Sequence, residues 1–186
     1  MSMDYYVYLK SLDTFSTEEC KRFFLNYDMK ADIHPDFDIN TQSGFLPFKL
    51  ELVSPEAPMK DKEFLTGFEF YLDDEYDYKA DLKELQPKGL KGLFKKQKYL
   101  YSAEIDPLIS DCKYFIDLNC GYEAFEASVA FGFAAYLVKN CGGIFYDPQD
   151  DRFITGFDEE YFKENIDSMN EFYQKEECEI HLFEKW

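Results

Sequence analysis

The chain has 186 residues, of which 46% are hydrophobic and 19% aromatic, and its formal net charge at pH 7 is −18. This length and apolar content suit a single folded domain over residues 1–186 and argue against global disorder. The excess of 38 acidic over 20 basic residues makes free nucleic acid and anionic membranes poor ligands, and it favours a basic protein partner.

The first half of the chain contains several strand patterns and one helix pattern. A helix is expected from Ser16 or Thr17 to about Asn26, and Ser16 with Glu19 has the spacing of a capping box. Runs that are β-rich or that alternate in polarity predict strands at 5–10, 45–53 and 64–74. Clusters of Pro, Gly, Asp, Asn and Ser predict loops at 34–44 and 54–63.

The second half contains the most apolar segment of the chain. Residues 119–141 are apolar nearly all round, so we expect a buried helix that ends at Gly142 and Gly143. A stripe of small residues on this helix predicts close backbone contact with a sheet or another helix: Ala124, Ser128, Gly132 and Ala135. Further elements are expected as strands at 98–105, 113–120 and 178–183, a turn at 106–111, a hairpin at 144–154 and a helix at 158–175.

The order of these elements predicts an α+β fold. Strands and helices are interspersed with several hairpins, so we expect a mostly antiparallel sheet with about three helices packed on it. The five cysteines form no CxxC pair and are odd in number, so free thiols in a reducing compartment are expected. The chain starts without a signal-peptide pattern, and its most apolar run, 124–138, contains Glu126 and is too short to span a bilayer. These features predict a cytoplasmic location.

One acid-rich segment, residues 72–84, has the acid spacing of an EF-hand calcium loop. The acids at that spacing are Asp73, Glu75, Asp77, Asp81 and Glu84. An EF-hand loop needs Gly at its sixth position, where this chain has Tyr78, and the segment follows a strand pattern instead of a helix. The sequence therefore predicts no calcium site here, and no metal or cofactor elsewhere. Because tyrosines lie between the acids, we interpret the segment as an acidic protein-binding patch with the candidate contacts Asp73, Asp74, Glu75 and Asp77.

The standard catalytic motifs are absent from the sequence, which contains no GxSxG, GxxxxGK[ST], GxGxxG or HExxH pattern. Of the two histidines, His34 precedes Pro35, a pair that is typical of a turn. Asp36 and Asp38 follow it closely, which gives one histidine and two carboxylates for a metal or acid–base site. An enzyme that uses His34 and neighbouring carboxylates therefore stays an alternative hypothesis.

The last predicted helix carries an acidic face, within a segment, 147–184, that holds 13 acids against three bases. Four apolar residues recur at helical spacing and predict its buried face: Phe162, Ile166, Met169 and Tyr173. Four acids recur on the opposite side: Glu160, Glu164, Asp167 and Glu171. Their mutual repulsion opposes helix formation, so helix stability does not explain the arrangement. We interpret these acids as candidate contacts for a basic partner, against the alternative of a surface kept acidic for solubility.

The segment from the apolar helix through GGIFYDPQDDRF is similar to helix–Gly–Gly–hairpin units in uncharacterised bacterial proteins. As a compact acidic α+β chain of this size, the protein also resembles the bacterial immunity proteins that neutralise polymorphic or contact-dependent toxins. The resemblance implies an inhibitor that binds one basic toxin domain, such as a nuclease, and performs no chemistry. Two alternatives stay open, a DNA-mimic or anti-restriction protein and the His34 enzyme.

Overall fold

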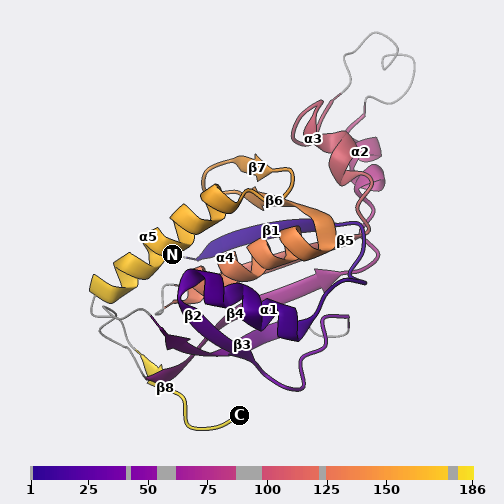
Figure 1. Cartoon of the computed structure of the whole chain (residues 1–186). Coiled ribbons are helices and arrows are strands. Elements are labelled where there is room, and N and C mark those ends of the chain that lie inside the picture. The colour runs from indigo at the N-terminus through magenta and orange to yellow at the C-terminus, as the bar shows by residue number, and fades with distance from the viewer. Residues whose placement is uncertain (1, 41–42, 54–61, 87–97, 122–124, 176–179) are drawn as a thin grey trace.

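The computed structural model describes residues 2–40, 43–53, 62–86, 98–121, 125–175 and 180–186. Their strands form one antiparallel sheet in the order β2-β3-β4-β5-β1-β6-β7, and β8 pairs with the start of β4 (Figure 1). The strands are β1 (Met3–Leu9), β2 (Met29–Ile33), β3 (Gly44–Leu52), β4 (Glu63–Asp73), β5 (Tyr114–Cys120), β6 (Gly143–Asp147), β7 (Arg152–Ile154) and β8 (His181–Leu182).

Five α-helices lie in the described residues, where the sequence predicts about three. They are α1 (Thr17–Phe24), α2 (Tyr78–Leu85), α3 (Ile105–Ile109), α4 (Glu126–Leu137) and α5 (Glu159–Lys175). A 3₁₀ turn, Leu25–Tyr27, extends α1, and a π-helical turn, Val138–Gly142, ends α4. The helices α1, α4 and α5 lie on one side of the sheet, and α2 with α3 packs on the other side (Figure 1). The α+β class and the antiparallel sheet are confirmed, and the helix count is corrected.

Alternation along β1 divides the core between the two faces of the sheet. Tyr5, Val7 and Leu9 point to the face under α4, where they join the main hydrophobic cluster. Tyr6 and Tyr8 point the other way, and Tyr8 is buried in a second cluster with residues of α2, α3 and β6. We name these two sides the helix face and the outer face.

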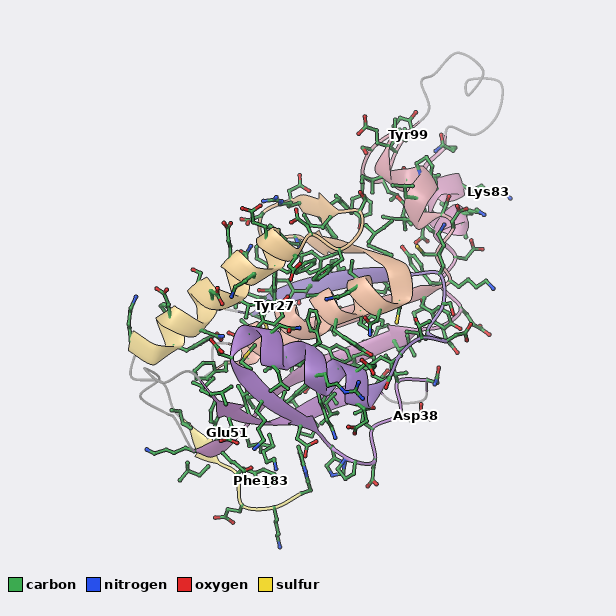
Figure 2. All side chains as sticks on the ribbon, in the orientation of Figure 1. Tyr27, Asp38, Glu51, Lys83, Tyr99 and Phe183 are labelled. Carbon is green, nitrogen blue, oxygen red and sulfur yellow. The ribbon has the colours of Figure 1, made fainter. Side chains whose placement is uncertain are left out.

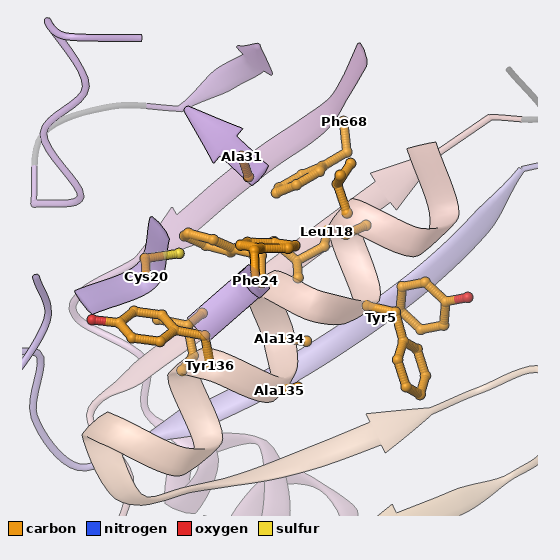
Figure 3. Packing of buried hydrophobic residues seen from close by; sticks show 14 of the residues in the cluster. Tyr5, Cys20, Phe24, Ala31, Phe68, Leu118, Ala134, Ala135 and Tyr136 are labelled. Atoms are coloured by element: carbon orange, nitrogen blue, oxygen red, sulfur yellow. The ribbon is translucent and has the colours of Figure 1, made fainter. Parts of the chain in front are cut away.

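The helix α4 is the centre of the main cluster because it is apolar on every side. All residues of Ala127–Leu137 are buried, as the sequence predicts. Gly132 allows α1 to approach closely, since a Cβ at this position would lie 2.6 Å from a ring carbon of Phe24. Figure 3 shows Phe24 among the buried residues around α4, which include Ala134, Ala135 and Tyr136. The other described members of the small-residue stripe, Ser128 and Ala135, are also buried, and Ala124 lies outside the described residues.

The helix α1 begins at the predicted cap, but only half of the predicted capping box forms. The Glu19 N–H donates to Ser16 Oγ at 3.4 Å. The Ser16 N–H donates instead to the Tyr136 hydroxyl at 2.9 Å, and the Glu19 carboxylate pairs with Arg22 at 2.8 Å. The Tyr136 hydroxyl also donates to the Ser16 carbonyl at 2.7 Å. The Tyr136 hydroxyl therefore joins the start of α1 to α4 through two hydrogen bonds with the Ser16 backbone.

The predicted strand at 98–105 is wrong, because a buried carboxylate folds this segment into a turn. Asp106 is 1% exposed, and its carboxylate accepts hydrogen bonds from three successive backbone N–H groups, those of Leu100, Tyr101 and Ser102. Ser102 Oγ accepts from the Ile105 N–H at 3.0 Å. The helix α3 begins there, at the last residue of the expected strand, and continues through most of the expected turn at 106–111.

The other predicted elements are present where the structure describes them. The strands β1, β3, β4 and β5, the β6–β7 hairpin and α5 all agree with the expected segments, and β8 is a two-residue part of the strand expected at 178–183. The buried face of α5 contains the predicted Phe162, Ile166 and Tyr173, with Met169 packed against it. The strand β2 was not expected, because its five residues lie between a helix signal and a loop signal.

Candidate functional site on the outer face of the sheet

The helices α2 and α3 cover only part of the outer face. Beyond them, Tyr71 on β4 and Phe45 on β3 are 54% and 49% exposed, respectively. The Phe45 ring lies over Gly67, where an added Cβ would come within 2.7 Å of that ring. This part of the outer face is therefore accessible to a ligand and partly aromatic.

Strand register gathers polar and aromatic side chains of three strands on this accessible surface. In one row across the sheet, Asp117 of β5 is paired with Tyr71 of β4 on one side and with Tyr6 of β1 on the other. Paired residues of antiparallel strands project from the same face, so the three side chains are neighbours. The adjacent row consists of Glu69, Asn119 and Asp4. We name these two rows together the open sheet patch.

Asp117 is an electrostatically unusual member of the open sheet patch. Its Oδ1 atom is buried and has no hydrogen-bond partner among the described protein groups. Burial and, to a smaller extent, the Asp4 carboxylate raise the pKa of Asp117 to about 6. At neutral pH the group is therefore charged, partly desolvated and unpaired, which is an unfavourable state that a cation would relieve.

Neighbouring groups fix the position of Asp4. The Asn119 side-chain amide donates to Asp4 Oδ1. The Asp4 N–H donates to Gln149 Oε1 at 3.0 Å, and Gln149 Nε2 donates back to the Asp4 carbonyl at 2.8 Å. Gln149 Nε2 also donates to Asp147 Oδ1 at 2.6 Å. The β6–β7 turn thus holds the start of β1, and with it one carboxylate of the patch, in a defined place.

The charges of the outer face differ between its two halves. On β2, on β3 and at the start of β4 the acids are neutralised, because Lys30 lies 2.6 Å from Glu51 and Lys49 lies 3.8 Å from Asp32 and 3.2 Å from Glu63. A cavity of about 230 Å³ beside α1 is lined by these charged groups. On β1, β5 and β4, no ion pair joins Asp4, Glu69 or Asp117 to a described lysine or arginine. The carboxylates in the acidic half of the outer face therefore have no ion-pair partner among the described lysines and arginines.

The C-terminal residues border the neutral half. Lys49 Nζ lies 5.2 Å from the centre of the Phe183 ring, and the Phe183 ring packs against Trp186 at 5.0 Å. Figure 2 shows Phe183 and Glu51 at one end of the molecule, and Lys83 and Tyr99 at the other end, on the part formed by α2 and α3. The open sheet patch lies on the strands between these two covered regions.

The first sequence-predicted patch adjoins the open sheet patch. Asp73 ends β4 and alternates with Glu69 and Tyr71 on the outer face, while Asp74 and Glu75 are exposed in the turn that follows. Two of the acids also shape the backbone, because Asp73 Oδ1 accepts from the Glu75 N–H at 3.0 Å and Asp77 Oδ1 caps α2 at the Ala80 N–H at 3.1 Å. Tyr78, expected between the acids at an interface, is instead buried in the second cluster.

The second sequence-predicted set lies on the other side of the sheet. Glu160, Glu164 and Glu171 are exposed and Asp167 is half-buried, on the helix α5 that packs against α4. Lys163 Nζ lies 2.9 Å from Asp167 and Lys175 Nζ lies 3.2 Å from Glu171, each one helical turn away. Because lysines neutralise two of the four acids, this face is less negative than the acid spacing alone indicates. The two predicted sets are not brought together.

His34 takes part in a loop and in a ring contact. Its Nδ1 accepts from the Asp36 N–H at 3.2 Å, and its ring packs edge-on against Trp186 at 5.1 Å. Asp38 Oδ1 accepts from the Asn40 N–H at 3.0 Å. Among the residues that the structure describes, no group of three or more His, Cys, Asp or Glu side chains is arranged to hold a metal ion.

Sequence reasoning missed the open sheet patch. The available signal was the alternation of polar residues with buried ones in three strands, at Asp4 and Tyr6, at Glu69 and Tyr71, and at Asp117 and Asn119. Such alternation indicates an outward-facing side but not which strands are neighbours.

No protein-family model matches the chain, and no curated protein and no solved structure matches it. Across the described residues, none of the helices has the length and apolar content needed to cross a membrane. Cys20, Cys112, Cys120 and Cys141 are free thiols, and Cys178 lies outside the described residues.

Proposed function

We propose that the protein is an acidic protein-binding inhibitor that neutralises a basic toxin domain by occluding its cationic surface, in the manner of a bacterial immunity protein. The observation that carries this proposal is the open sheet patch, which presents three carboxylates and two tyrosines without a compensating cation from the described chain. Interfaces between proteins are enriched in tyrosine, and charged groups there are arranged to face opposite charges.

Inhibition by this surface needs no chemistry. The net charge of −18 attracts a basic domain over long range and speeds its association at low salt. Once bound, the acidic surface occupies the cationic groove that the toxin uses for its own anionic substrate. A nuclease is the class of toxin with such a groove, because it must neutralise phosphates.

The arrangement of the acids favours an inhibitor of one partner over a DNA mimic. A mimic needs its acids along one continuous face, whereas Asp73–Asp77 and the α5 acids lie on opposite sides of the sheet. Two of the α5 acids also have lysine partners on their own helix. A compact acidic patch on one face fits a single docking site better.

The test compares two charge-matched variants with the wild type, in their protection of cells against the toxin domain and in their affinity for it. The sheet variant is Glu69→Gln with Asp117→Asn, and the helix variant is Glu164→Gln with Glu171→Gln. Each removes two acids, so the net charge changes equally. A basic nuclease-like toxin domain, taken from a gene beside this one where such a gene is present, is co-expressed with each form, and calorimetry then measures its affinity at 50 and 300 mM salt, values chosen on either side of about 0.15 M.

We expect the wild type to restore growth and to bind more weakly at the higher salt. Binding by the wild type that is independent of salt, or an absence of protection against the toxin, would contradict the proposal. The variants separate specific docking from general charge, because a purely electrostatic solubility surface predicts equal effects of the sheet and helix variants.

A further inference from the structure

We propose that the free edge of β2 pairs with the β2 edge of a second copy of this chain, so that the two sheets become continuous across a two-fold axis. This inference goes beyond the proposed inhibitor function and does not depend on it, because β3 separates the β2 edge from the open sheet patch.

The edge of β2 is accessible to another strand. Among the described strands, only β3 pairs with β2, which is the first strand in the sheet order. The helix α1 lies beside β2 (Figure 1) but does not fill the space along its edge, since the cavity of about 230 Å³ lies there. Ala31 of β2 and Leu25, which follows α1 and is 51% exposed, both line this cavity.

The backbone of β2 directs hydrogen-bonding groups to this open side. The Val53 N–H donates to the Asp28 carbonyl at 2.9 Å, one step beyond the end of the β2–β3 register. Because hydrogen-bonded pairs alternate in an antiparallel ladder, Lys30 and Asp32 bond to β3, and the N–H and carbonyl groups of Ala31 point away from β3. Among the described residues, none forms a hydrogen bond with these two Ala31 groups. Unpaired backbone groups on a sheet edge are a template for another strand.

The proline in β3 agrees with this alternation. Pro47 is an odd-numbered residue of β3 like Lys49 and Glu51, whose backbone groups face β2, and it lies one residue beyond the end of the β2 register. Its missing N–H therefore costs no bond to β2 or to β4.

The sequence of β2, MKADI, is self-complementary about Ala31. When two copies run antiparallel with Ala31 opposite Ala31, Lys30 of each copy lies across from Asp32 of the other on the outer face. On the helix face, Met29 of each copy lies across from Ile33 of the other. Opposite charges directly across a strand pair stabilise it, and like charges destabilise it.

The same charges select this register over its neighbours. A shift of the second copy by two residues places Lys30 opposite Lys30 in one direction, and Asp32 opposite Asp32 in the other. A shift by one residue moves the apolar side chains of the second copy to the outer face. Pairing about Ala31 is therefore the favoured arrangement, and it gives an isologous dimer.

Pairing also keeps the charges of the edge balanced. In the single chain, Asp32 lies 2.7 Å from Lys21 of α1, which reaches across the edge to the outer face. Lys30 of the second copy takes the place of Lys21 beside Asp32. Lys21 keeps its other partner, Glu18, at 3.1 Å, and Lys30 keeps Glu51 at 2.6 Å.

The direct test is the oligomeric state of the full chain. Because the paired edge has only five residues, association should depend on concentration, and sedimentation equilibrium from about 1 μM to about 1 mM covers the range needed. We expect the average mass of the wild type to rise from 22.1 kDa toward twice that value. Ala31→Pro removes the N–H that a second copy would bond, whereas the β2–β3 ladder loses no bond, so this variant should stay monomeric.

Two charge reversals test the register. Lys30→Glu meets Asp32 of the second copy, and Asp32→Lys meets Lys30, so each variant alone should dimerise about tenfold more weakly than the wild type. An equimolar mixture of the two variants restores opposite charges at both contacts and should associate more tightly than either variant alone. Lys10→Glu is the matched control, since Lys10 is as exposed as Lys30 and also has one acidic partner, Asp111 at 3.6 Å. It should dimerise like the wild type.

Three results would overturn the inference. They are a wild-type mass of 22.1 kDa at every concentration, dimerisation of Ala31→Pro as tight as that of the wild type, and a mixture that associates no more tightly than its two components. Circular dichroism checks that Ala31→Pro is folded, and if it is not, the mixture decides. None of these measurements involves a toxin, so the dimer and the proposed function stand or fail separately.

Discussion

Replacing Asp117 by asparagine should stabilise the free protein at pH 8 and leave it little changed at pH 4. Burial raises the pKa of the folded carboxyl to about 6, against an ordinary value of 3.8 in the unfolded chain. The folded state therefore binds this proton more tightly. The resulting stability is fully present below pH 4, is lost as the pH rises through about 6, and stays absent at higher pH. Asparagine keeps the shape of the side chain and removes the charge.

The difference between the two pKa values corresponds to at most about 3 kcal/mol, because each pH unit is worth about 1.4 kcal/mol. Asp117 is only partly buried, so solvent screening lowers the expected gain to about 1–2 kcal/mol. For a chain of this length, the midpoint of thermal unfolding should rise by about 3–6 °C at pH 8. Glu69→Gln, on the neighbouring strand but exposed, serves as the control and should change stability by less than about 0.5 kcal/mol at either pH.

Urea unfolding at pH 4, 6 and 8, followed by circular dichroism, measures the free energy of unfolding of both variants and the wild type. Destabilisation of the protein by Asp117→Asn at pH 8 would contradict this expectation, because the carboxylate would then have a favourable partner in the folded state. An equal gain at pH 4 and pH 8 would also refute it, since the effect would not come from the charge.

Four further predictions concern other parts of the fold. Asp106→Ala leaves three backbone N–H groups without their buried acceptor and should lower the free energy of unfolding by about 3 kcal/mol or more, as measured by urea unfolding. Gly132→Ala forces a methyl group into a ring of α1 and should lower it by about 1–3 kcal/mol. Ser128→Ala on the same helix removes a hydroxyl that has no partner among the described groups, so its thermal midpoint should match the wild type. Glu164→Gln with Glu171→Gln breaks only one exposed pair with a lysine, so the unfolding free energy should change by less than about 0.5 kcal/mol.

The regular elements were predictable because their signals are local. The helix α4 is a long, continuously apolar segment, and α5 has apolar residues that recur at helical spacing. The Ser16 cap of α1 depends only on residues within one helical turn. The segment 98–105 has the β-rich composition of a strand. Three of its backbone N–H groups donate to the Asp106 carboxylate, however, and are therefore not available to pair with a neighbouring strand. A local side-chain hydrogen bond of this kind competes with strand pairing, and composition does not reveal it.

The candidate site was only partly predictable for a different reason. The acids at 73–77 and on α5 are close in sequence, so their charge density is visible without a fold. Asp4, Glu69 and Asp117 are far apart in sequence and become neighbours only through the register of β4, β5 and β1. The sequence also did not reveal that Lys163 and Lys175 would each pair with an acid of the α5 stripe. Uncompensated charge is therefore a property of the assembled sheet.

The charge of Asp117 has opposite effects on stability and on binding, because it lowers the stability of the free protein and strengthens binding to a cationic partner. In the free protein its charge is partly desolvated and unpaired, so removing the charge stabilises the fold. In a complex with a cationic partner the same charge gains its missing counterpart, so removing it weakens binding. A surface kept acidic only for solubility predicts the gain in stability but no loss of binding. Asp117→Asn that raises the unfolding midpoint at pH 8 and lowers the affinity for the toxin domain would therefore distinguish a docking site from a solvated face in a single variant.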